Sequence, residues 1–179
     1  NPLKSIAVES ADSICKGDEI TAGHYLKLPT LAEILRAAGR KTAIAGTKPV
    51  AILHDRFDRA HIKQPDRPTS ETPNTPADAA MTRSLVGPMW DAGVPAFSLL
   101  WLSEPDQTQH MTGPGSERSI EALKGSDRNL ALVLSELDAK HSRKDTDIFV
   151  VSDHGFSTIS RAVNTVDELK KAGFNATRE

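Results

Sequence analysis

The sequence lacks several features that would assign it to a specialised class of protein. Its single cysteine, Cys15, excludes an internal disulfide framework and a zinc cluster built from cysteines. No apolar run approaches the roughly 18 residues that a membrane-spanning helix needs. The formal charge is only −2, from 22 basic and 24 acidic residues, so no strong basic field would draw the chain to a nucleic-acid polymer.

What is present describes a folded domain. Hydrophobic residues make up 38% of the 179 positions, and 11 glycines add to the apolar share. That share allows a buried core and excludes wholesale disorder. The length corresponds to one domain, or to one domain with an arm. The chain begins Asn1-Pro2 without a start methionine or a signal peptide. We therefore expect a piece of a longer protein, whose localisation is not readable from its start.

Periodicity and turn residues predict an α/β arrangement. Thr30 and Glu33 have the spacing of a capping box at the start of a helix that stops near Gly39, and a short apolar strand follows at 41–45. A helix, a glycine and then a strand is a step typical of parallel sheets. Further helices are expected at 77–92, 116–140 and 165–172, buried strands at 95–102 and 147–151, a short strand at 4–8, and irregular chain at 11–24, 47–76 and 103–115.

The stretch 47–76 is long, irregular and rich in proline. Loops of this length in a compact domain are usually functional or mobile. We interpret it as an insertion or a loop on the substrate side, from which Lys48 or Arg56 would meet a phosphate. A solvated, charged loop with no role in binding is the alternative.

Two polar segments carry the candidate chemistry, and each follows a predicted strand. Asp106 and His110 lie four residues apart, and Asp153 and His154 are adjacent. Because ligands bind beyond the carboxyl ends of parallel strands, both pairs are expected at one edge of the sheet. Mixed oxygen and nitrogen ligands suit zinc or a similar divalent ion, and two such pairs indicate two metals. The alternative is that these residues only cap strand ends and bind no metal.

The residues from Leu28 to Gly173 resemble the alkaline phosphatase superfamily, and most closely its type I phosphodiesterase or nucleotide pyrophosphatase branch. The resemblance is carried by the segments LPTLAEILRAAGRKTAIAG, EPDQTQHMTGPGS and FVVSDHGFST, with a helix of the SDRNL type before the last. It implies a three-layer α/β sandwich with a mostly parallel central sheet. Residues 1–179 would then form part of one catalytic domain.

The resemblance also implies a site and a mechanism. Asp106 and His110 would bind one divalent metal, and Asp153 and His154 a second, with zinc the expected ion. Glu104 would orient the loop that carries Asp106, or would support the metal ligands from the outer shell of the site. A metal-activated Thr or Ser would attack phosphorus in line, and the covalent phospho-enzyme would then be hydrolysed. We find no matching nucleophile motif, and Thr30 fits a helix cap better. We therefore expect the nucleophile upstream and a further metal-binding histidine downstream. Because each metal would keep only two protein ligands here, we expect the 179 residues to be inactive alone.

The resemblance implies a small phosphoester or nucleotide substrate. Members of the family are often periplasmic, extracellular or anchored to a membrane, and the sequence indicates no oligomeric state. Phosphomonoesterase, phosphonate hydrolase, phosphomutase and sulfatase activities occur on the same fold and remain open. A non-catalytic binding module that kept the fold is a further alternative.

Overall fold

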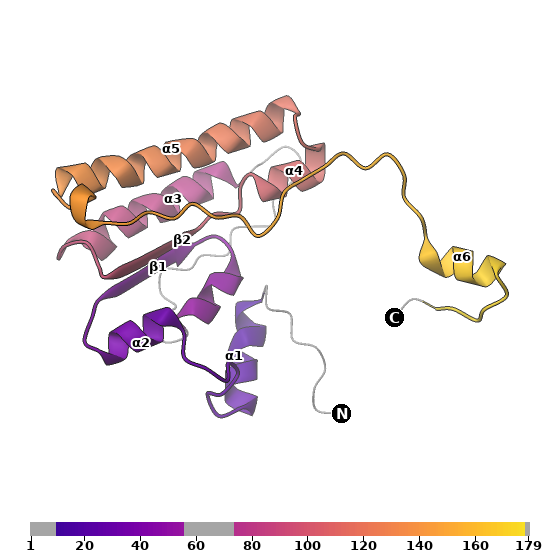
Figure 1. Cartoon of the computed structure of the whole chain (residues 1–179), viewed down its shortest axis with the longest axis horizontal. Helices are drawn as coiled ribbons and strands as arrows, with labels where there is room; N and C mark the ends of the chain where they lie inside the picture. The colour runs from indigo at the N-terminus through magenta and orange to yellow at the C-terminus, as the bar shows by residue number, and fades with distance from the viewer. Residues whose placement is uncertain (1–9, 56–73, 178–179) are drawn as a thin grey trace.

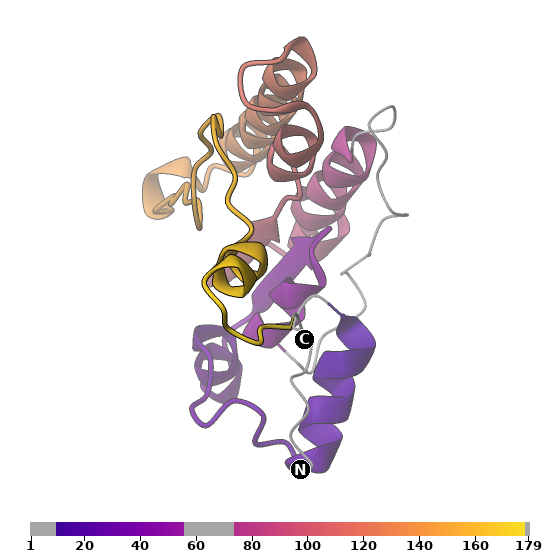
Figure 2. The same cartoon turned by 90° about the vertical axis from the view of Figure 1, so that its right-hand side faces the viewer.

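The computed structural model describes residues 10–55 and 74–177. At its centre, strands β1 (Thr42–Gly46) and β2 (Phe97–Trp101) pair in parallel, with Thr42 opposite Phe97 and Gly46 opposite Trp101. Helices lie on both sides of this pair (Figures 1 and 2). The protein is therefore α/β with a parallel sheet flanked by helices, as predicted. A larger central sheet and a full three-layer sandwich stay predictions.

The two faces of β1 bury different cores, as the alternation of side chains along a strand requires. Ala43 and Ala45 pack in a cluster with residues of α3 (Thr75–Val86) and α5 (Glu117–Ala139). Ile44 points to the other face and packs with Ala32 of α2 (Leu31–Ala37). The apolar run of β1 is thus buried on both faces, which confirms the predicted strand at 41–45; its central place in a larger sheet stays a prediction.

The predicted helices form where local signals placed them. The capping box at α2 is present, with Thr30 accepting from the Glu33 amide and the Glu33 carboxylate accepting from the Thr30 amide. Ser116 caps α5 and Asn164 caps α6 (Thr165–Lys171). Pro88 ends the regular part of the 77–92 prediction, since α3 stops at Val86 and a 3₁₀ turn, η2 (Pro88–Trp90), follows.

Two segments expected to be irregular are helical. Helix α1 (Ala11–Ile20) is capped by Ser10 and buries Ile14, a single apolar contact too sparse to give a periodic pattern. Helix α4 (Asp106–Thr112) lies within the predicted loop 103–115, where polar residues hide the helical period. The remaining short elements are 3₁₀ helices η1 (Pro49–His54) and η3 (Arg143–Asp145).

The predicted strand at 147–151 is wrong. These residues are extended but pair with no strand among those described, and Phe149, Val150 and Val151 are 83%, 74% and 85% exposed. Only Ile148 packs against the core. An apolar run encodes a need for burial, but a strand also requires a neighbour with free backbone groups at the right place. Figure 1 shows this segment running past the sheet towards α6, which is set apart from the other helices.

Some predictions lie outside the described residues. These are the short strand at 4–8, Arg56, and the greater part of the loop 47–76. Within the described residues, no helix combines the length and apolar character that crossing a membrane would take.

Candidate metal centre

The site is built at the carboxyl ends of the two paired strands. Lys48 follows the end of β1, and Asp106 is the first residue of α4, a few residues beyond the end of β2. His110 lies one helical turn after Asp106 on the same helix, so both side chains share one face. His154 reaches this place from the extended segment after residue 151. The structure therefore brings His154, from the second polar segment, beside Asp106 and His110 of the first, although no paired strand directly precedes His154 in the described part of the chain.

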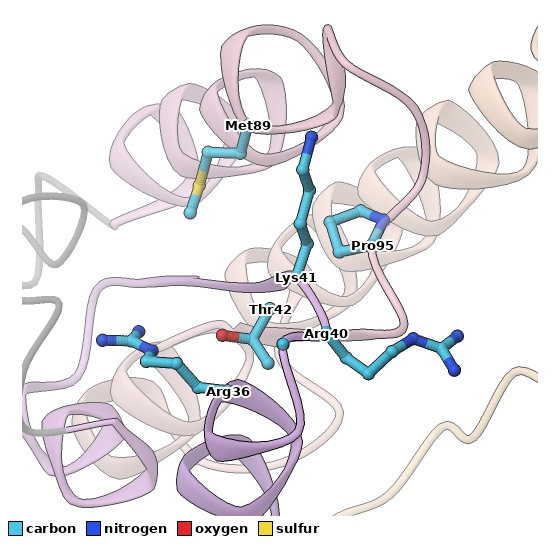
Figure 3. A pocket seen from close by; sticks show the side chains of 7 residues that line it. Arg36, Arg40, Lys41, Thr42, Met89 and Pro95 are labelled. Atoms are coloured by element: carbon cyan, nitrogen blue, oxygen red, sulfur yellow. The ribbon is translucent and has the colours of Figure 1, made fainter.

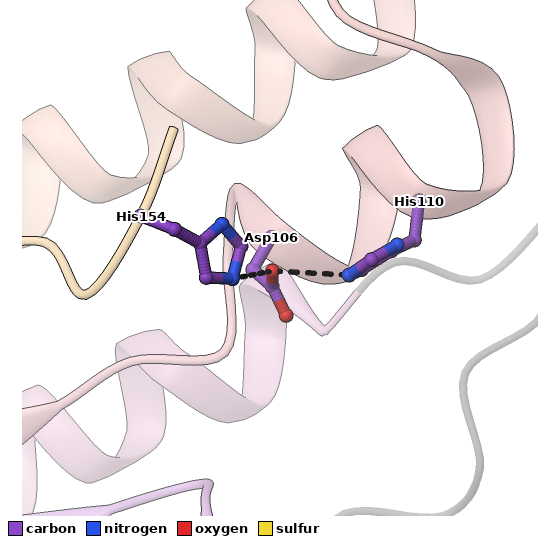
Figure 4. Close-up of side chains that lie close together, drawn as sticks. All are labelled: Asp106, His110 and His154. Carbon is purple, nitrogen blue, oxygen red and sulfur yellow. Dashed lines mark ion pairs between the residues drawn. The ribbon is translucent and has the colours of Figure 1, made fainter. Parts of the chain in front are cut away.

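Two imidazole side chains converge on one carboxylate oxygen of Asp106. His110 Nε2 and His154 Nε2 each lie 3.4 Å from Asp106 Oδ1. Figure 4 shows the two imidazoles approaching Asp106 from opposite sides. One oxygen and two nitrogen atoms of these residues lie within 4.8 Å of one another. This is the donor set and the number of protein ligands that catalytic zinc sites use.

The hydrogen bonding of Asp106 fits a cation. Its Oδ1 atom is buried and has no hydrogen-bond partner. A buried carboxylate oxygen without a partner is costly and rare. A divalent ion held between Asp106, His110 and His154 would satisfy it, so the residues present fit the metal that the sequence predicts.

The second oxygen of Asp106 is already paired. Asp106 Oδ2 accepts a hydrogen bond from Lys48 Nζ at 3.0 Å. Both side chains are partly exposed, at 19% for Lys48 and 27% for Asp106. The structure thus places Lys48, predicted as a phosphate contact, directly beside the candidate metal ligand.

Phe156 is a member of the site that the sequence analysis did not single out. Its ring lies edge-on to both imidazoles, with centroid distances of 4.9 Å to His110 and 5.2 Å to His154. Edge-to-face contacts of this kind are favourable, and they restrict the orientations of the two histidine rings. The one feature of the sequence that could have indicated Phe156 is its position two residues after His154.

Asp153 lies outside the three-residue cluster. Its side chain is 75% exposed, and its Oδ2 is 3.8 Å from His154 Nε2. Its Oδ1 accepts the backbone N–H of His154 at 3.1 Å. The structure therefore groups His154 with Asp106 and His110, whereas the sequence analysis paired His154 with Asp153 at a second metal. A role for Asp153 as a ligand stays a prediction.

Glu104 is buried behind the site, with 4% of its surface exposed. Its two carboxylate oxygens accept the backbone N–H groups of Asn74, at 2.8 Å, and Thr108, at 3.1 Å. These bonds join the first turn of α4 to the residue that precedes α3. Arg56 lies outside the described residues.

A separate cleft of about 380 Å³ opens at the other end of β1 (Figure 3). It contains no carboxylate or imidazole among its lining residues, so it has none of the metal-binding donors found at Asp106. Its lining is basic and apolar, and consists of Arg36, Gly39, Arg40, Lys41, Thr42, Met89 and Pro95.

The fold and this cluster define an α/β protein with a candidate metal centre at the carboxyl edge of a parallel sheet. The sequence model of the family described as type I phosphodiesterase / nucleotide pyrophosphatase matches residues 18–178, nearly the whole chain. The chain belongs to that family.

Curated relatives are similar over shorter spans. A venom phosphodiesterase of Naja atra is 35% identical over 66 residues, which are 37% of this chain and 8% of the relative. Venom phosphodiesterase 2 of Crotalus adamanteus gives the same identity and coverage. Ectonucleotide pyrophosphatase/phosphodiesterase family member 7 of Mus musculus is 28% identical over 72 residues, 40% of this chain and 16% of the relative. The matched part of this chain thus spans a small fraction of each relative.

Proposed function

We propose that the protein containing this chain is a metal-dependent phosphoester hydrolase, acting as a phosphodiesterase or nucleotide pyrophosphatase. One observation carries the proposal: Asp106 Oδ1, buried and without a hydrogen-bond partner, lies 3.4 Å from two imidazole nitrogens at the carboxyl edge of the sheet. Family membership and the names of the similar phosphodiesterases support the same reaction class.

The residues of this chain would act by binding and orientation. Asp106, His110 and His154 would hold a divalent ion, with zinc the best match to their donor atoms. Such an ion, when bound, polarises a phosphoryl oxygen and activates a nucleophile. Phe156 restrains the two imidazoles, and the Lys48 ammonium group offers a positive charge to a phosphoryl oxygen approaching the site.

Several finer features of the proposal rest on the resemblance to the family. They are a second divalent ion with Asp153 among its ligands, and a Thr or Ser nucleophile supplied by another part of the protein. The substrate would be a small phosphoester or a nucleotide. Residues 1–179 would form part of one catalytic domain, with 47–76 on the substrate side.

The proposal is tested on the full-length protein with a nitrophenyl phosphodiester as substrate. Asp106→Ala and Asp153→Ala should each lower turnover, and metal analysis should show bound divalent ion lost from Asp106→Ala. His24→Ala, a change at an exposed histidine that does not belong to the cluster of Asp106, His110 and His154, is the matched control. Unchanged turnover in both Asp106→Ala and Asp153→Ala would refute the assignment as a metal-dependent phosphoester hydrolase. Nitrophenyl monoester, phosphonate and sulfate substrates separate the alternative hydrolases.

A further inference from the structure

A second carboxylate lies behind the metal centre and was not apparent from the sequence. Asp78, on α3, is 1% exposed. Its Oδ1 accepts hydrogen bonds from the hydroxyl of Thr47 and from the backbone N–H of Ser103, the latter at 3.0 Å. Its Oδ2 accepts the backbone N–H of Glu104 at 2.9 Å. The Ser103 hydroxyl also donates to Oδ1, at 3.2 Å.

These donors are neutral hydroxyl and amide groups. Burial raises the pKa of Asp78, and the hydrogen bonds from Thr47, Ser103 and Glu104 oppose that shift. Removing a carboxylate from water costs free energy unless its oxygens are well satisfied. A well-satisfied buried carboxylate holds its partners in one fixed geometry.

The partners of Asp78 are the two chain segments that carry the site. Thr47 directly precedes Lys48 at the end of β1, and its hydroxyl also lies 2.8 Å from that of Ser103. Ser103 and Glu104 lie in the short connection between β2 and Asp106. Asp78 therefore bonds to both strand ends at once.

The network continues into α4 through Glu104. The carboxylate of Glu104 accepts the backbone N–H of Thr108 at 3.1 Å. Its carbonyl oxygen accepts the hydroxyl of Ser126, on α5, at 3.0 Å. The first turn of α4, which presents Asp106, is thus held through Glu104 to Asp78 and to α5.

We infer that Asp78 is a positioning residue, which joins the ends of β1 and β2 and so holds Asp106 where His110, His154 and Lys48 meet it. Asp78 touches neither the ion nor the substrate, and acts through the backbone of Ser103 and Glu104. The inference rests on the proposed function, because it assigns Asp78 to the metal centre of that function.

The test compares Asp78→Asn with wild type in the 179-residue chain. Asparagine has nearly the same shape, but it offers one acceptor oxygen and one NH₂ donor. It cannot accept both backbone N–H groups, so one of Ser103 and Glu104 loses its bond. Thr82→Val is the matched control: Thr82 is also buried on α3, and its hydroxyl donates to the backbone carbonyl of Asp78 and not to the Asp78 carboxylate.

Two quantities are measured: the dissociation constant of Zn²⁺ by calorimetry, and amide hydrogen exchange at Ser103 and Glu104. We expect Asp78→Asn to weaken Zn²⁺ binding about tenfold or more, the usual effect of losing a group that orients metal ligands. Exchange at Ser103 or Glu104 should accelerate. Thr82→Val should change neither quantity, even where it lowers stability. If Asp78→Asn fails to fold, Thr47→Val removes the Thr47 hydroxyl with its bonds to Asp78 and Ser103, leaves the bonds from the backbone N–H groups to Asp78 in place, and should show a smaller loss of affinity.

The outcomes separate this inference from the proposed function. Asp106→Asn reports whether any Zn²⁺ binding belongs to the site. If binding depends on Asp106 but is unchanged in Asp78→Asn, the inference is overturned and the proposed function stands. If no binding depends on Asp106, the metal proposal fails in this chain, and hydrogen exchange alone decides. Exchange at Ser103 or Glu104 that is faster in Asp78→Asn but not in Thr82→Val supports the positioning role of Asp78. Equal exchange rates in these two variants overturn that role.

Discussion

Lys48 and Asp106 form an ion pair in which Lys48 Nζ lies 3.0 Å from Asp106 Oδ2. The pair links the chain just after β1 to the first turn of α4. The pair uses one oxygen of the Asp106 carboxylate, while the other oxygen faces His110 and His154. A single carboxylate therefore stands between an ammonium group and a candidate metal site. The two positive charges would share it, which sets the affinity of the site for cations.

The first prediction follows from this shared carboxylate. Lys48→Met keeps most of the side-chain length and removes the charge, so Zn²⁺ should bind more tightly. The expected gain is about fivefold or more, because even two unit charges about 4 Å apart in water interact by roughly 1 kcal/mol and the zinc ion carries two. Calorimetric titration measures it. Lys124→Met, which removes an exposed ion pair with Glu121 on α5, is the control and should leave Zn²⁺ affinity unchanged. Weaker binding in Lys48→Met would contradict the argument.

The second prediction concerns the two residues of the Asp153-His154 pair. The structure brings only His154 into contact distance of Asp106, at 3.4 Å, and leaves Asp153 75% exposed. In the 179-residue chain, His154→Gln should therefore abolish tight Zn²⁺ binding, because the cluster falls below the three ligands typical of catalytic zinc. Asp153→Asn should change the dissociation constant by less than about threefold, under 1 kcal/mol. Equal losses in both variants would show that Asp153 is a ligand.

Local signals in the sequence were sufficient for much of the fold. The capping box of Thr30 and Glu33 acts within one turn of chain, and so it was readable without any tertiary information. The i, i+4 spacing of Asp106 and His110 likewise places both on one face once α4 forms. The apolar run 147–151 was misleading because burial and pairing are separate requirements, and pairing depends on distant chain.

The parts of the site that escaped prediction depend on contacts distant in sequence. Asp78 bonds to Ser103, which is 25 residues away, and no spacing rule indicates such a pair. Phe156 is recognised only once His110 and His154 are known to flank it. Sequence patterns indicated the candidate metal ligands, whereas the residues that contact those ligands and their chain segments became visible only in the folded chain.

A third prediction concerns the crossing of α3 and α5. Gly125 is buried there, and a Cβ atom on it would lie 2.7 Å from Thr75 Cγ2. Gly125→Ala should therefore destabilise the chain by about 1–2 kcal/mol, since overpacking outweighs the helix propensity that alanine gains. In a Thr75→Ser background the methyl group is gone, and the same substitution should become neutral or stabilising. A double-mutant cycle by urea denaturation measures the coupling. Additive effects would show that the contact relaxes freely.

The fourth prediction is a pH dependence of stability. The ring of His54 is partly buried against Trp101, at a centroid distance of 5.8 Å, and burial lowers its pKa below 6.5. Below pH 6.5 the unfolded chain binds a proton at His54 before the folded chain does. The contribution of neutral His54 to stability is therefore complete above pH 6.5 and is lost as the pH falls through the folded-state pKa.

This dependence is measured by urea denaturation across that pH range, together with an NMR titration of His54. Wild type should lose more stability on acidification than His54→Gln does. His24→Gln, at an exposed histidine, should follow wild type. Parallel curves for wild type and His54→Gln would refute the assignment of the effect to His54.

The fifth prediction concerns the apolar segment 147–151. Phe149 and Val151 are 83% and 85% exposed, and β2 pairs with β1 alone in the described sheet. An extended apolar segment with unpaired backbone groups is a template for pairing with another chain. The 179-residue chain should therefore self-associate with rising concentration in analytical ultracentrifugation. Phe149→Asp with Val151→Lys should reduce that association.

The control for the fifth prediction is Val163→Lys, which adds one charge at an apolar residue that is 53% exposed but outside the segment. A general effect of charge on solubility would reduce association in this variant as well. If self-association disappears only when Phe149 and Val151 are changed, strand pairing by this segment is its cause. A wild-type chain that stays monomeric at every concentration would instead indicate that the segment finds its partner within its own chain, and β2 offers the free edge for it.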